Sequence, residues 1–348
     1  MSLRTPGHGD RTRGARARET TLADIARRAG VSSMTVSRAL NRPETLAGKT
    51  RAKVLRAIEE LGYVPNRLAR SLATQRTSAV AAIIPVLNQV FAPTIEGMTR
   101  VLSAEGLDLI LGISNYNAQT EEDLVRAFLA RRVDGIALVG ASHTEATRTL
   151  LAQTTAPVVQ MWTIPDEPLA DVVGFSHWKG SQMMARYLWQ TGRRRIGYVG
   201  GPTAGNDRTS ARLRGFLDYM AEVGAPVPPD HIEEARVFLI EEGARCFERL
   251  IARCPDLDAV YAASDVLAAG VVFAATRRGI RVPQDLAVAG FDDAEIARSM
   301  IPTLTTVRID ADRIGARAAT VLVERIGGRD DEPAVEELPV DLILREST

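Results

Sequence analysis

The stretch TLADIARRAGVSSMTVSRALNRPE, residues 21–44, decides the fold of the N-terminal part of the chain. Its first apolar residues have the i, i+3, i+4, i+7 spacing of an amphipathic helix, namely Leu22, Ile25, Ala26 and Ala29. Thr21 is suited to cap this helix, and Gly30 to make the left-handed turn after it. A second helix, capped by Ser32, is predicted from Ser33 to Leu40. Two helices joined by a short turn that contains glycine form a helix-turn-helix unit.

The residues that follow predict a third helix, from Lys49 to Leu61, which stops at Gly62. Its apolar side is expected to comprise Val54, Leu55, Ile58 and Leu61. Val36 and Leu40 of the second helix face inward as well, so residues 20–64 are predicted to form a compact helical unit. Many helical hairpins share this spacing without binding DNA, and the spacing alone leaves both interpretations open.

The outer face of the second helix favours DNA binding. Where a solvated helix would usually carry Glu or Lys, this face carries Ser33, Met34, Thr35, Ser37 and Arg38. Hydroxyl groups reach phosphates, an arginine can bind guanine through two hydrogen bonds, and an apolar side chain can contact a thymine methyl group. The N-terminus of a helix also favours phosphate.

The net charge of zero hides an asymmetry along the chain. Residues 1–76 contain 16 Arg and Lys against 6 Asp and Glu, whereas the remainder contains 27 basic and 37 acidic residues. A basic head on an acidic body predicts an anionic polymer as the partner of the head. Residues 1–19 are nearly devoid of apolar side chains, so we predict a disordered basic leader. Residues 65–76 are interpreted as a linker, or as a hinge segment that becomes helical on DNA.

From about Thr77, short apolar runs alternate with amphipathic stretches. The runs cover residues 79–85, 107–114, 134–140, 157–162, 195–200, 259–264 and 285–291. Continuous apolar runs predict strands buried on both faces, and helices between them predict parallel sheets. About 270 residues are more than one such sheet needs, so two doubly wound α/β lobes are expected. Ligands of such folds bind at the carboxyl ends of the strands.

Composition and motifs exclude several other classes of protein. The 348 residues, 45% hydrophobic and 25% charged, are typical of a soluble protein with two or three domains. No apolar run approaches the ~18 residues of a membrane span, and the first twenty residues lack the apolar segment of a signal peptide. Cys246 and Cys254 give no disulfide framework and have no His at zinc spacing. HExxH, GxSxG and phosphate-loop motifs are absent. We therefore expect a cytoplasmic protein that is not an enzyme and has no cofactor and no metal.

Residues 21–44, joined to GKTRAKVLRAIEELGYVPNRLARSLAT (48–74), resemble the DNA-binding head of the LacI/GalR-type transcriptional regulators. The segments AGVS, TVSRALN and LGYVPN carry the resemblance in the head. It continues through the body in RRVDGIAL (131–138), RRRIGYVGG (193–201), ASDVLAAG (263–270), VPQDLAVAGFDD (282–293) and LTTVRID (304–310). The resemblance covers nearly all of residues 21–346.

The resemblance implies a small all-α helix-turn-helix head and an α/β, periplasmic-binding-protein-like body of two doubly wound lobes. The head would comprise residues 20–64, the hinge 65–76 and the body 77–348. The first lobe would hold about 77–175 and 307–336, and the second about 176–305 and 337–348. A homodimer with a small molecule in the cleft between the lobes is implied as well.

The family's DNA-contacting positions fall on residues of the head and the hinge. Ser33, Met34 and Arg38 match base-reading positions. Asn66 matches the start of the hinge helix, and Leu72 matches an apolar wedge pushed into the minor groove, which gains a bent DNA for the cost of unstacking. The remaining DNA-binding candidates are Thr21, Ser32, Thr35, Ser37, Asn41 and Arg70.

The effector cleft is implied by the same resemblance. Arg212 matches the arginine that anchors the effector and Asp265 the acid that binds its hydroxyl groups. The remaining effector-binding candidates are Asn88, Phe91, Trp162 and Arg208. Structural roles compete with these assignments: a salt bridge for Arg212, a helix N-cap for Asp265 and core packing for the two aromatic residues. His177, near a crossing between the lobes, is interpreted as a helix cap or an inter-lobe contact.

One branch of the family is more similar than the others, the gluconate-utilisation repressors. NQVFAPTIEGM (88–98) and VGFSHWKG (173–180) carry this similarity, and it implies a repressor of sugar-acid catabolism released from a double-stranded operator by its effector. A purine-type regulator that needs a corepressor is the alternative, although the sequence shows no clear pair of aromatic residues to hold a base. A sugar-binding transport protein is disfavoured by the basic head, and a sugar kinase is a remote third.

Overall fold

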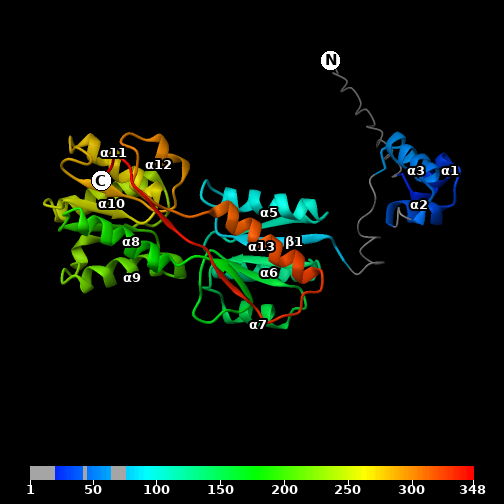
Figure 1. The fold of residues 1–348 in the computed structure, drawn as a ribbon, viewed down its shortest axis with the longest axis horizontal. Helices are drawn as coiled ribbons and strands as arrows, with labels where there is room; N and C mark the ends of the chain where they lie inside the picture. Colours follow the sequence, from blue (N-terminus) through cyan, green and yellow to red (C-terminus); the bar gives the residue numbers. More distant parts are fainter. Residues whose placement is uncertain (1–19, 42–44, 64–75) are drawn as a thin grey trace, which may run out of the picture. The chain divides into compact units, whose positions relative to one another are not determined.

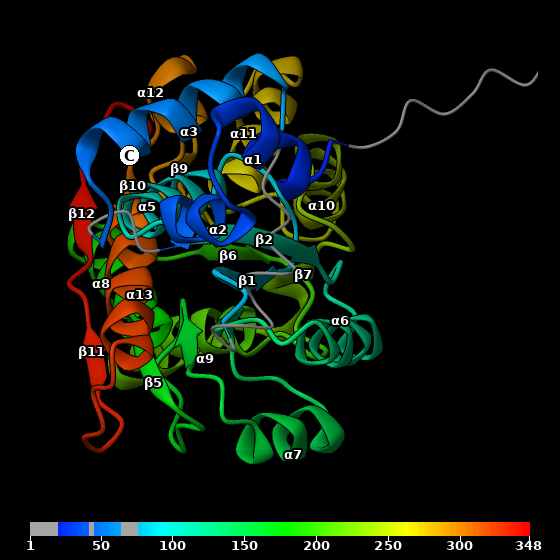
Figure 2. The same ribbon diagram turned by 90° about the vertical axis from the view of Figure 1, so that its right-hand side faces the viewer.

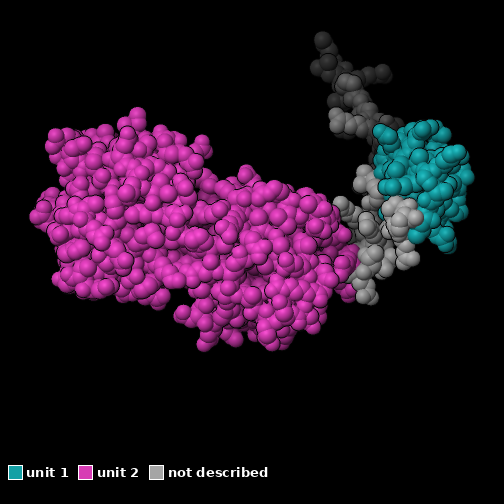
Figure 3. All heavy atoms as spheres, viewed as in Figure 1, with its two compact units in different colours: residues 1–75 teal, residues 76–348 magenta. Residues whose placement is uncertain are grey.

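The structure, a computed structural model, describes residues 20–41, 45–63 and 76–348. The chain divides into two compact units, residues 1–75 and residues 76–348, which are coloured separately in Figure 3. We call them the head and the body. No described helix is long and apolar enough to cross a membrane.

Within its described residues, 20–41 and 45–63, the head contains three short helices around a small core. They are α1 (Leu22–Ala29), α2 (Ser33–Asn41) and α3 (Gly48–Glu60), and α1 packs against both of the others. The buried apolar side chains are Ile25, Ala26, Val36, Ala39, Val54 and Ala57. The three predicted helices are thus confirmed. The prediction that Leu55 faces the core is wrong, because Leu55 is 46% exposed; α3 meets α1 and α2 through Val54 and the positions three and four residues further on.

The first lobe of the body is a six-stranded parallel sheet in the order β11-β5-β4-β3-β1-β2. Its strands are β1 (Ala79–Ile84), β2 (Asp108–Ile113), β3 (Gly135–Val139), β4 (Val158–Met161), β5 (Asp171–Gly174) and β11 (Val335–Glu337). One face is covered by α5 (Ala92–Ala104) and α13 (Ala311–Ile326), and Figure 2 shows α13 beside β5. The other is covered by α6 (Ala118–Ala130) and α7 (Glu145–Gln153).

The second lobe is a four-stranded parallel sheet in the order β7-β6-β8-β9. The strands are β6 (Ile196–Gly200), β7 (Ile232–Glu234), β8 (Ala259–Ala262) and β9 (Ala287–Ala289). Figure 1 shows α10 (Ile240–Arg253) and α11 (Asp265–Arg277) on one face, and α8 (His177–Gln190) and α9 (Asp207–Glu222) on the other. Two short helices complete the lobe, η2 (Pro229–His231) and α12 (Glu295–Ser299).

Three passages of the chain join the two lobes. The first runs from β5 into α8. The second runs through β10 (Thr306–Arg308) to α13, and the third from β11 to β12 (Asp341–Ile343). Strands β10 and β12 pair with each other in antiparallel fashion, so two of the passages are hydrogen-bonded together. One continuous hydrophobic core extends from the α5–α13 side of the first lobe to the α8–α9 side of the second.

All seven apolar runs predicted as strands are confirmed. Strands β5, β7, β10 and β11 were not among the predicted runs. Strands β7 and β11 lie at the edges of their sheets and read IEE and VEE. An edge strand is half solvated and does not need a continuous apolar run, which explains why the apolar pattern misses these two.

Two glycines allow α5 and α13 to approach each other closely. A Cβ at Gly97 of α5 would collide with the carbonyl oxygen of Asp312, and a Cβ at Gly315 of α13 would collide with the carbonyl oxygen of Thr94. Both obstacles are main-chain atoms, which cannot rotate away as a flexible side chain would. The first lobe therefore needs glycine at both positions.

Replacing Gly315 with alanine is expected to lower the free energy of unfolding of the body by about 1–3 kcal/mol, because the added methyl group overpacks a tight helix contact. Urea denaturation followed by circular dichroism measures this loss. Gly48→Ala is the control, since a Cβ at Gly48 meets no atom within 4 Å. Equal stability of the Gly315→Ala variant and the parent chain would contradict this account of the α5–α13 contact.

Candidate functional site

The turn between α1 and α2 is fixed by side-chain caps at both helix starts. The Thr21 hydroxyl accepts from the Asp24 N–H, and the Asp24 carboxylate accepts from the Thr21 N–H, which makes a capping box. Gly30 ends α1 with φ of 68°, a left-handed conformation that glycine adopts without strain. The Ser32 hydroxyl accepts from the Thr35 N–H at 3.1 Å, which caps α2. The predicted roles of Thr21, Gly30 and Ser32 in the fold of the head are confirmed, and the contribution of Asp24 to the capping box is an addition.

The outer face of α2 is open to solvent. Ser33, Met34 and Arg38 are exposed, and the Met34 side chain is 66% exposed. Thr35 and Ser37 are half-buried. A single exposed apolar side chain is common on protein surfaces, so the exposure of Met34 leaves it accessible to a partner but does not by itself identify one.

The remaining DNA-binding candidates are covered only in part by the structure. Asn41 is the last residue of α2, but its side chain lies outside the described part of the chain. Asn66, Arg70 and Leu72 also lie outside the described residues.

Five of the six effector candidates line one cavity between the lobes of the body. They are Asn88, Phe91, Trp162, Arg208 and Arg212. Sequence reasoning did not single out several of their neighbours in the same cavity: Val90, Tyr116, Asn206, Phe238, Ser264, Val266 and Asp292. The cavity volume is about 40 Å³. This is far below the 300–1,000 Å³ of typical ligand pockets, so the lobes must part to admit a sugar-sized molecule.

Arg212, on α9, lies at the floor of this cavity in a dense set of contacts. Its Nε donates to His177 Nδ1 at 3.0 Å, its Nη1 to the Ala263 carbonyl at 2.7 Å and its Nη2 to Asp292 Oδ1 at 2.9 Å. Its guanidinium carbon lies 3.8 Å from the centroid of the Phe291 ring. The side chains of Arg212 and Asp292 are only 9% and 5% exposed. Arg212 thus makes the structural salt bridge that was the alternative interpretation of this residue. Its side chain also lines the cavity, so the structure accommodates both interpretations.

His177 joins the two lobes through the same network. Because arginine can only donate, His177 Nδ1 accepts, and His177 Nε2–H donates to the Trp162 carbonyl at 2.6 Å. Burial and the Arg212 charge lower the pKa of His177 well below its ordinary value, so the ring is neutral. Trp162 Nε1–H in turn donates to the Thr94 hydroxyl at 3.1 Å. A chain of hydrogen bonds therefore runs from α5 in the first lobe to Arg212 in the second.

The structure places Asp265 away from the cavity lining. Asp265 is fully buried and accepts from the Ala294 N–H at 2.7 Å and from the Thr306 hydroxyl at 2.6 Å. Burial, with the nearby Asp292 carboxylate, raises the pKa of Asp265 well above its ordinary value. Ser264 is the N-cap of α11, so the alternative interpretation of Asp265 as a helix N-cap is wrong.

Asp292 is the carboxylate that lines the cavity. It follows β9, at the carboxyl end of a buried strand, and its φ of 114° is rare for a residue with a side chain. Burial raises the pKa of Asp292, and the Arg212 charge opposes this rise. The sequence held a signal for this carboxylate: the acidic pair Asp292 and Asp293 ends the segment VPQDLAVAGFDD, just after the apolar run that forms β9.

Aromatic side chains form the walls of the cavity. Phe91 and Trp162 have ring centroids 4.5 Å apart in the first lobe. Tyr116 of the first lobe and Phe238 of the second face each other with centroids 5.7 Å apart and planes tilted by 35°. The sequence carries no sign of this second pair, because Tyr116 and Phe238 are 122 positions apart and only the fold brings them together.

Arg208 lies in the first turn of α9 and lines the cavity. The Cβ that Gly140 lacks would occupy the position of the Arg208 guanidinium, so glycine at the end of β3 makes room for it. Arg208 Nη1 reaches Asp207 Oδ1 at 3.3 Å. The Asp207 N–H donates to the Ser142 hydroxyl at 3.2 Å, which links the start of α9 in the second lobe to the first lobe.

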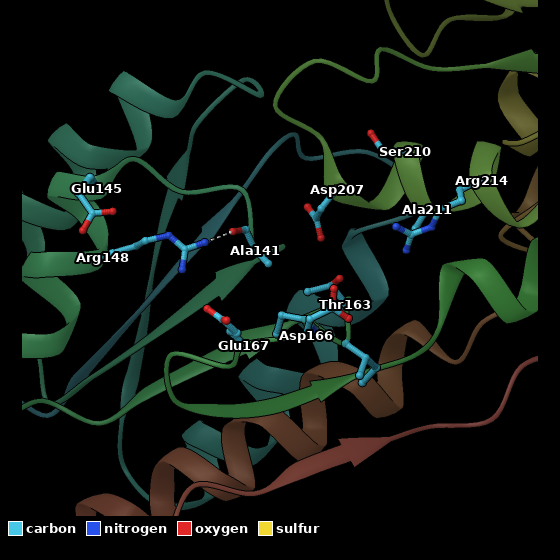
Figure 4. A pocket seen from close by; sticks show the side chains of 12 residues that line it. Ala141, Glu145, Arg148, Thr163, Asp166, Glu167, Asp207, Ser210, Ala211 and Arg214 are labelled. Carbon is cyan, nitrogen blue, oxygen red and sulfur yellow. Dashed lines mark hydrogen bonds between the residues drawn. The ribbon is translucent and has the colours of Figure 1, made fainter.

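The opposite face of α9 borders a second, wider groove between the lobes (Figure 4), with a volume of about 810 Å³. Glu145 and Arg148 of α7 lie on one side, and Asp207, Ser210 and Arg214 of α9 on the other. Arg148 donates to the Ala141 carbonyl at 3.1 Å. The groove is open, and Glu145, Asp166, Glu167 and Arg214 are exposed, although Arg148 and Asp207 are half-buried. The inner cavity instead gathers buried polar groups, Arg208, Arg212 and Asp292 among them. Convergent buried groups mark a ligand site better than volume does.

Comparisons with known proteins agree with this two-part architecture. Residues 21–66 match the bacterial regulatory proteins of the lacI family, and residues 185–348 match a periplasmic binding protein-like domain. The HTH-type transcriptional regulator GntR of Pseudomonas aeruginosa is 35% identical over 349 residues, which cover 100% of both chains. The chain belongs to the LacI family of bacterial transcriptional regulators. It is a DNA-binding regulator and not an enzyme.

Two further relatives show the same LacI-family similarity over nearly the whole chain. The HTH-type transcriptional repressor PurR of Pasteurella multocida is 33% identical over 94% of this chain and 98% of its own length. The crystal structure of the lac repressor dimer bound to operator and the anti-inducer ONPF superposes with a TM-score of 0.85, at 26% identity, over 95% of this chain and 99% of that one. The predicted fold class and family are confirmed.

Proposed function

We propose that this LacI-family regulator is a repressor of sugar-acid catabolism, and that a sugar acid in the inter-lobe cavity releases it from its operator. The observation that carries the effector class is the charge of the cavity lining. Its charged side chains are two guanidinium groups, Arg208 and Arg212, and one carboxylate, Asp292. Guanidinium groups bind carboxylates through paired hydrogen bonds. A ligand carboxylate would therefore bind Arg208 or Arg212 in competition with their present partners, Asp207 and Asp292.

The hydroxyl groups of such a ligand match the remaining polar lining. Asp292 and Ser264 supply oxygen acceptors, and the Trp162 and Phe91 rings supply an apolar wall. Asn88 supplies an amide N–H donor, because its Oδ1 already accepts from the Val90 and Phe91 N–H groups. We propose Asp292, rather than Asp265, as the acid that binds hydroxyl groups. The GntR relative named above and the LacI-family branch that this sequence resembles support the same effector class.

On the DNA, we propose that Ser33, Met34 and Arg38 of α2 reach base edges in the major groove. Thr21, Ser32, Thr35, Ser37 and Asn41 would contact phosphates or flanking groups, together with Arg70. For the hinge we propose the roles that the resemblance implies, Asn66 at the start of the hinge helix and Leu72 as the apolar wedge in the minor groove. The cytoplasm, where the operator lies, is the proposed location.

The proposed partner of the chain is a second copy of itself. Strand β2 is an edge strand, and it exposes Leu111 and Ile113. The loop that enters α10 exposes Val237 and Leu239, and it touches the end of the β2 region through the contact between Tyr116 and Phe238. An unpaired edge strand beside exposed apolar side chains promotes aggregation, and a dimer interface prevents this by covering them. Two heads on one dimer would read two half-sites of a roughly palindromic operator.

The mechanism follows from residues of both lobes sharing one ligand. A sugar acid held by Arg208, Arg212 and Asp292 of the second lobe, and by Asn88 of the first, stabilises one arrangement of the lobes over the other. The change in operator affinity can only equal the ligand's differential affinity for the two arrangements. A tenfold change corresponds to about 1.4 kcal/mol.

A purine corepressor is the second candidate, because Tyr116 and Phe238 face each other across the cleft. A flat base could stack on such rings. The PurR relative, at 33% identity, supports this candidate as well.

Thermal-shift measurements distinguish the two effector classes. The full chain is heated with a six-carbon sugar acid, with the neutral sugar of the same skeleton, or with a purine base. We expect the sugar acid alone to raise Tm, because a ligand at 100 times its Kd stabilises the folded state by about 2.7 kcal/mol. A shift with the purine alone would favour the corepressor. No shift with any of the three would contradict the effector proposal.

Replacing Met34 with alanine is expected to relax the base preference at one operator position and to leave the salt dependence of binding unchanged, because Met34 carries no charge. Competition binding with single-base operator variants, at several salt concentrations, measures both quantities. The control is Leu55→Ala, which removes another exposed apolar side chain of the head. An unchanged base preference in the Met34→Ala protein would show that this side chain does not read DNA.

A further inference from the structure

Three side chains that can bind metals meet in the second lobe, away from the effector cavity. Asp230 and His231 belong to η2, which precedes the edge strand β7, and Cys254 is the C-cap of α10. A carboxylate oxygen, an imidazole nitrogen and the Cys254 sulfur all lie within 4.8 Å of one another. Sequence spacing gave no sign of this cluster, because 23 positions separate His231 from Cys254 and only the fold brings them together.

Main-chain contacts hold the cluster in place and leave two of its side chains available. The Asp230 carbonyl accepts from Arg253 Nη2 at 3.1 Å and from the Cys254 thiol at 3.6 Å, which ties η2 to the end of α10. In the described part of the chain, neither the Asp230 carboxylate nor the His231 ring has a hydrogen bond or an ion pair with another residue. Cys254 is a free thiol and only 4% exposed.

We propose that Asp230, His231 and Cys254 form a binding site for a borderline-soft divalent metal ion of the Zn²⁺ class. A thiolate, an imidazole nitrogen and a carboxylate oxygen are the donors that Zn²⁺ selects, typically in a tetrahedron at about 2.0–2.3 Å from each donor. Three protein donors leave the fourth position to water, and the exposed Asp230 gives that position access to solvent. Small side-chain rotations suffice to bring donors that already lie within 4.8 Å of one another onto one ion.

The surrounding charges permit a cation at this position. Arg253 is the nearest guanidinium group, and Glu233 pairs with it at 2.6 Å. Glu233 also pairs with Arg249 at 2.7 Å. Asp230 and Asp256 add negative charge beside Cys254, and the metal-bound thiolate would add more. A bound ion would cross-link the segment between α9 and β7 to the end of α10.

None of the three ligands lines the effector cavity. We therefore expect the ion to stabilise the second lobe rather than to take part in effector binding.

Cobalt is a suitable probe, because a cysteine thiolate bound to Co²⁺ gives a charge-transfer band that carboxylate and imidazole ligands do not give. The full chain, reduced and free of metal, is titrated with Co²⁺ and then with Zn²⁺. We expect a thiolate band that saturates at one Co²⁺ per chain and disappears when Zn²⁺ displaces the cobalt. Cys254→Ser should lack the band. Cys246→Ser is the matched control and should keep it, because Cys246 is bonded to Arg249 and lies outside the cluster.

A parent chain that shows no thiolate band overturns the proposal. So does a band that survives in Cys254→Ser or is lost in Cys246→Ser. If Cys254→Ser does not fold, His231→Gln provides a second test on a half-buried side chain, and circular dichroism checks that the variant is folded. Loss of a metal ligand should weaken Co²⁺ binding by at least about tenfold. Unchanged binding by His231→Gln would overturn the three-ligand site.

Discussion

Replacing Arg212 with alanine is expected to abolish the effect of the sugar acid on operator binding. The substitution removes the guanidinium group that faces the cavity, and it leaves the buried Asp292 carboxylate and His177 without their partner. Removing one member of a buried ion pair costs about 3–5 kcal/mol, so the body of the Arg212→Ala protein should also unfold at lower temperature. Operator affinity measured by fluorescence anisotropy, with and without the sugar acid, tests the first effect, and thermal unfolding tests the second.

The matched control is Arg214→Ala, two residues further along α9. Arg214 is exposed and borders only the outer groove, so its loss should leave both operator binding and the effector response unchanged. Arg212→Lys keeps the charge and loses the forked geometry, and it serves if the alanine variant does not fold. A full effector response in either folded Arg212 variant would show that the cavity around this residue is not the effector site.

Replacing Val36 with aspartate is expected to unfold the head and to abolish operator binding. Val36 is fully buried in a core of six side chains, and an unpaired carboxylate there costs about 4 kcal/mol or more. A unit of some 40 residues is stabilised by about 2–6 kcal/mol. The body is a separate compact unit and should keep its thermal transition and its ligand-induced shift.

The control for this prediction is Leu55→Asp, which adds the same charge at an exposed position of the head. Circular dichroism and thermal shift follow the two units, and anisotropy on the operator follows DNA binding. Operator binding by the Val36→Asp chain at the level of the Leu55→Asp chain would contradict the assignment of DNA binding to the head.

Local signals in the sequence predict the head and the central strands. The apolar spacing of Leu22 to Ala29, the cap at Thr21 and the turn at Gly30 all act within one or two helical turns, so they can be recognised without tertiary structure. The apolar strands follow for the same reason, since burial on both faces leaves a continuous apolar run. The edge strands β7 and β11 are polar, so no continuous apolar run identifies them in the sequence.

The cavity could be predicted only in part, because its residues come from distant segments. Arg212 follows from the family resemblance, and Trp162 from its place at the end of a predicted strand. Asp265 and Asp292 both lie at the carboxyl ends of neighbouring strands, β8 and β9, and only the three-dimensional arrangement shows which carboxylate faces the cavity. The pair Tyr116 and Phe238 depends on how the two lobes close, for which a single sequence has no local signal.

The measurement that tests the central claim most directly is operator binding by the full chain as the effector is titrated. The operator is first selected from a random duplex library, and its affinity is then measured with increasing sugar acid, while thermal shift reports that the ligand occupies the body. The account predicts that operator affinity falls at least tenfold as the ligand saturates, and that Arg214→Ala behaves in the same way. An operator affinity that stays constant while the ligand is bound would contradict it.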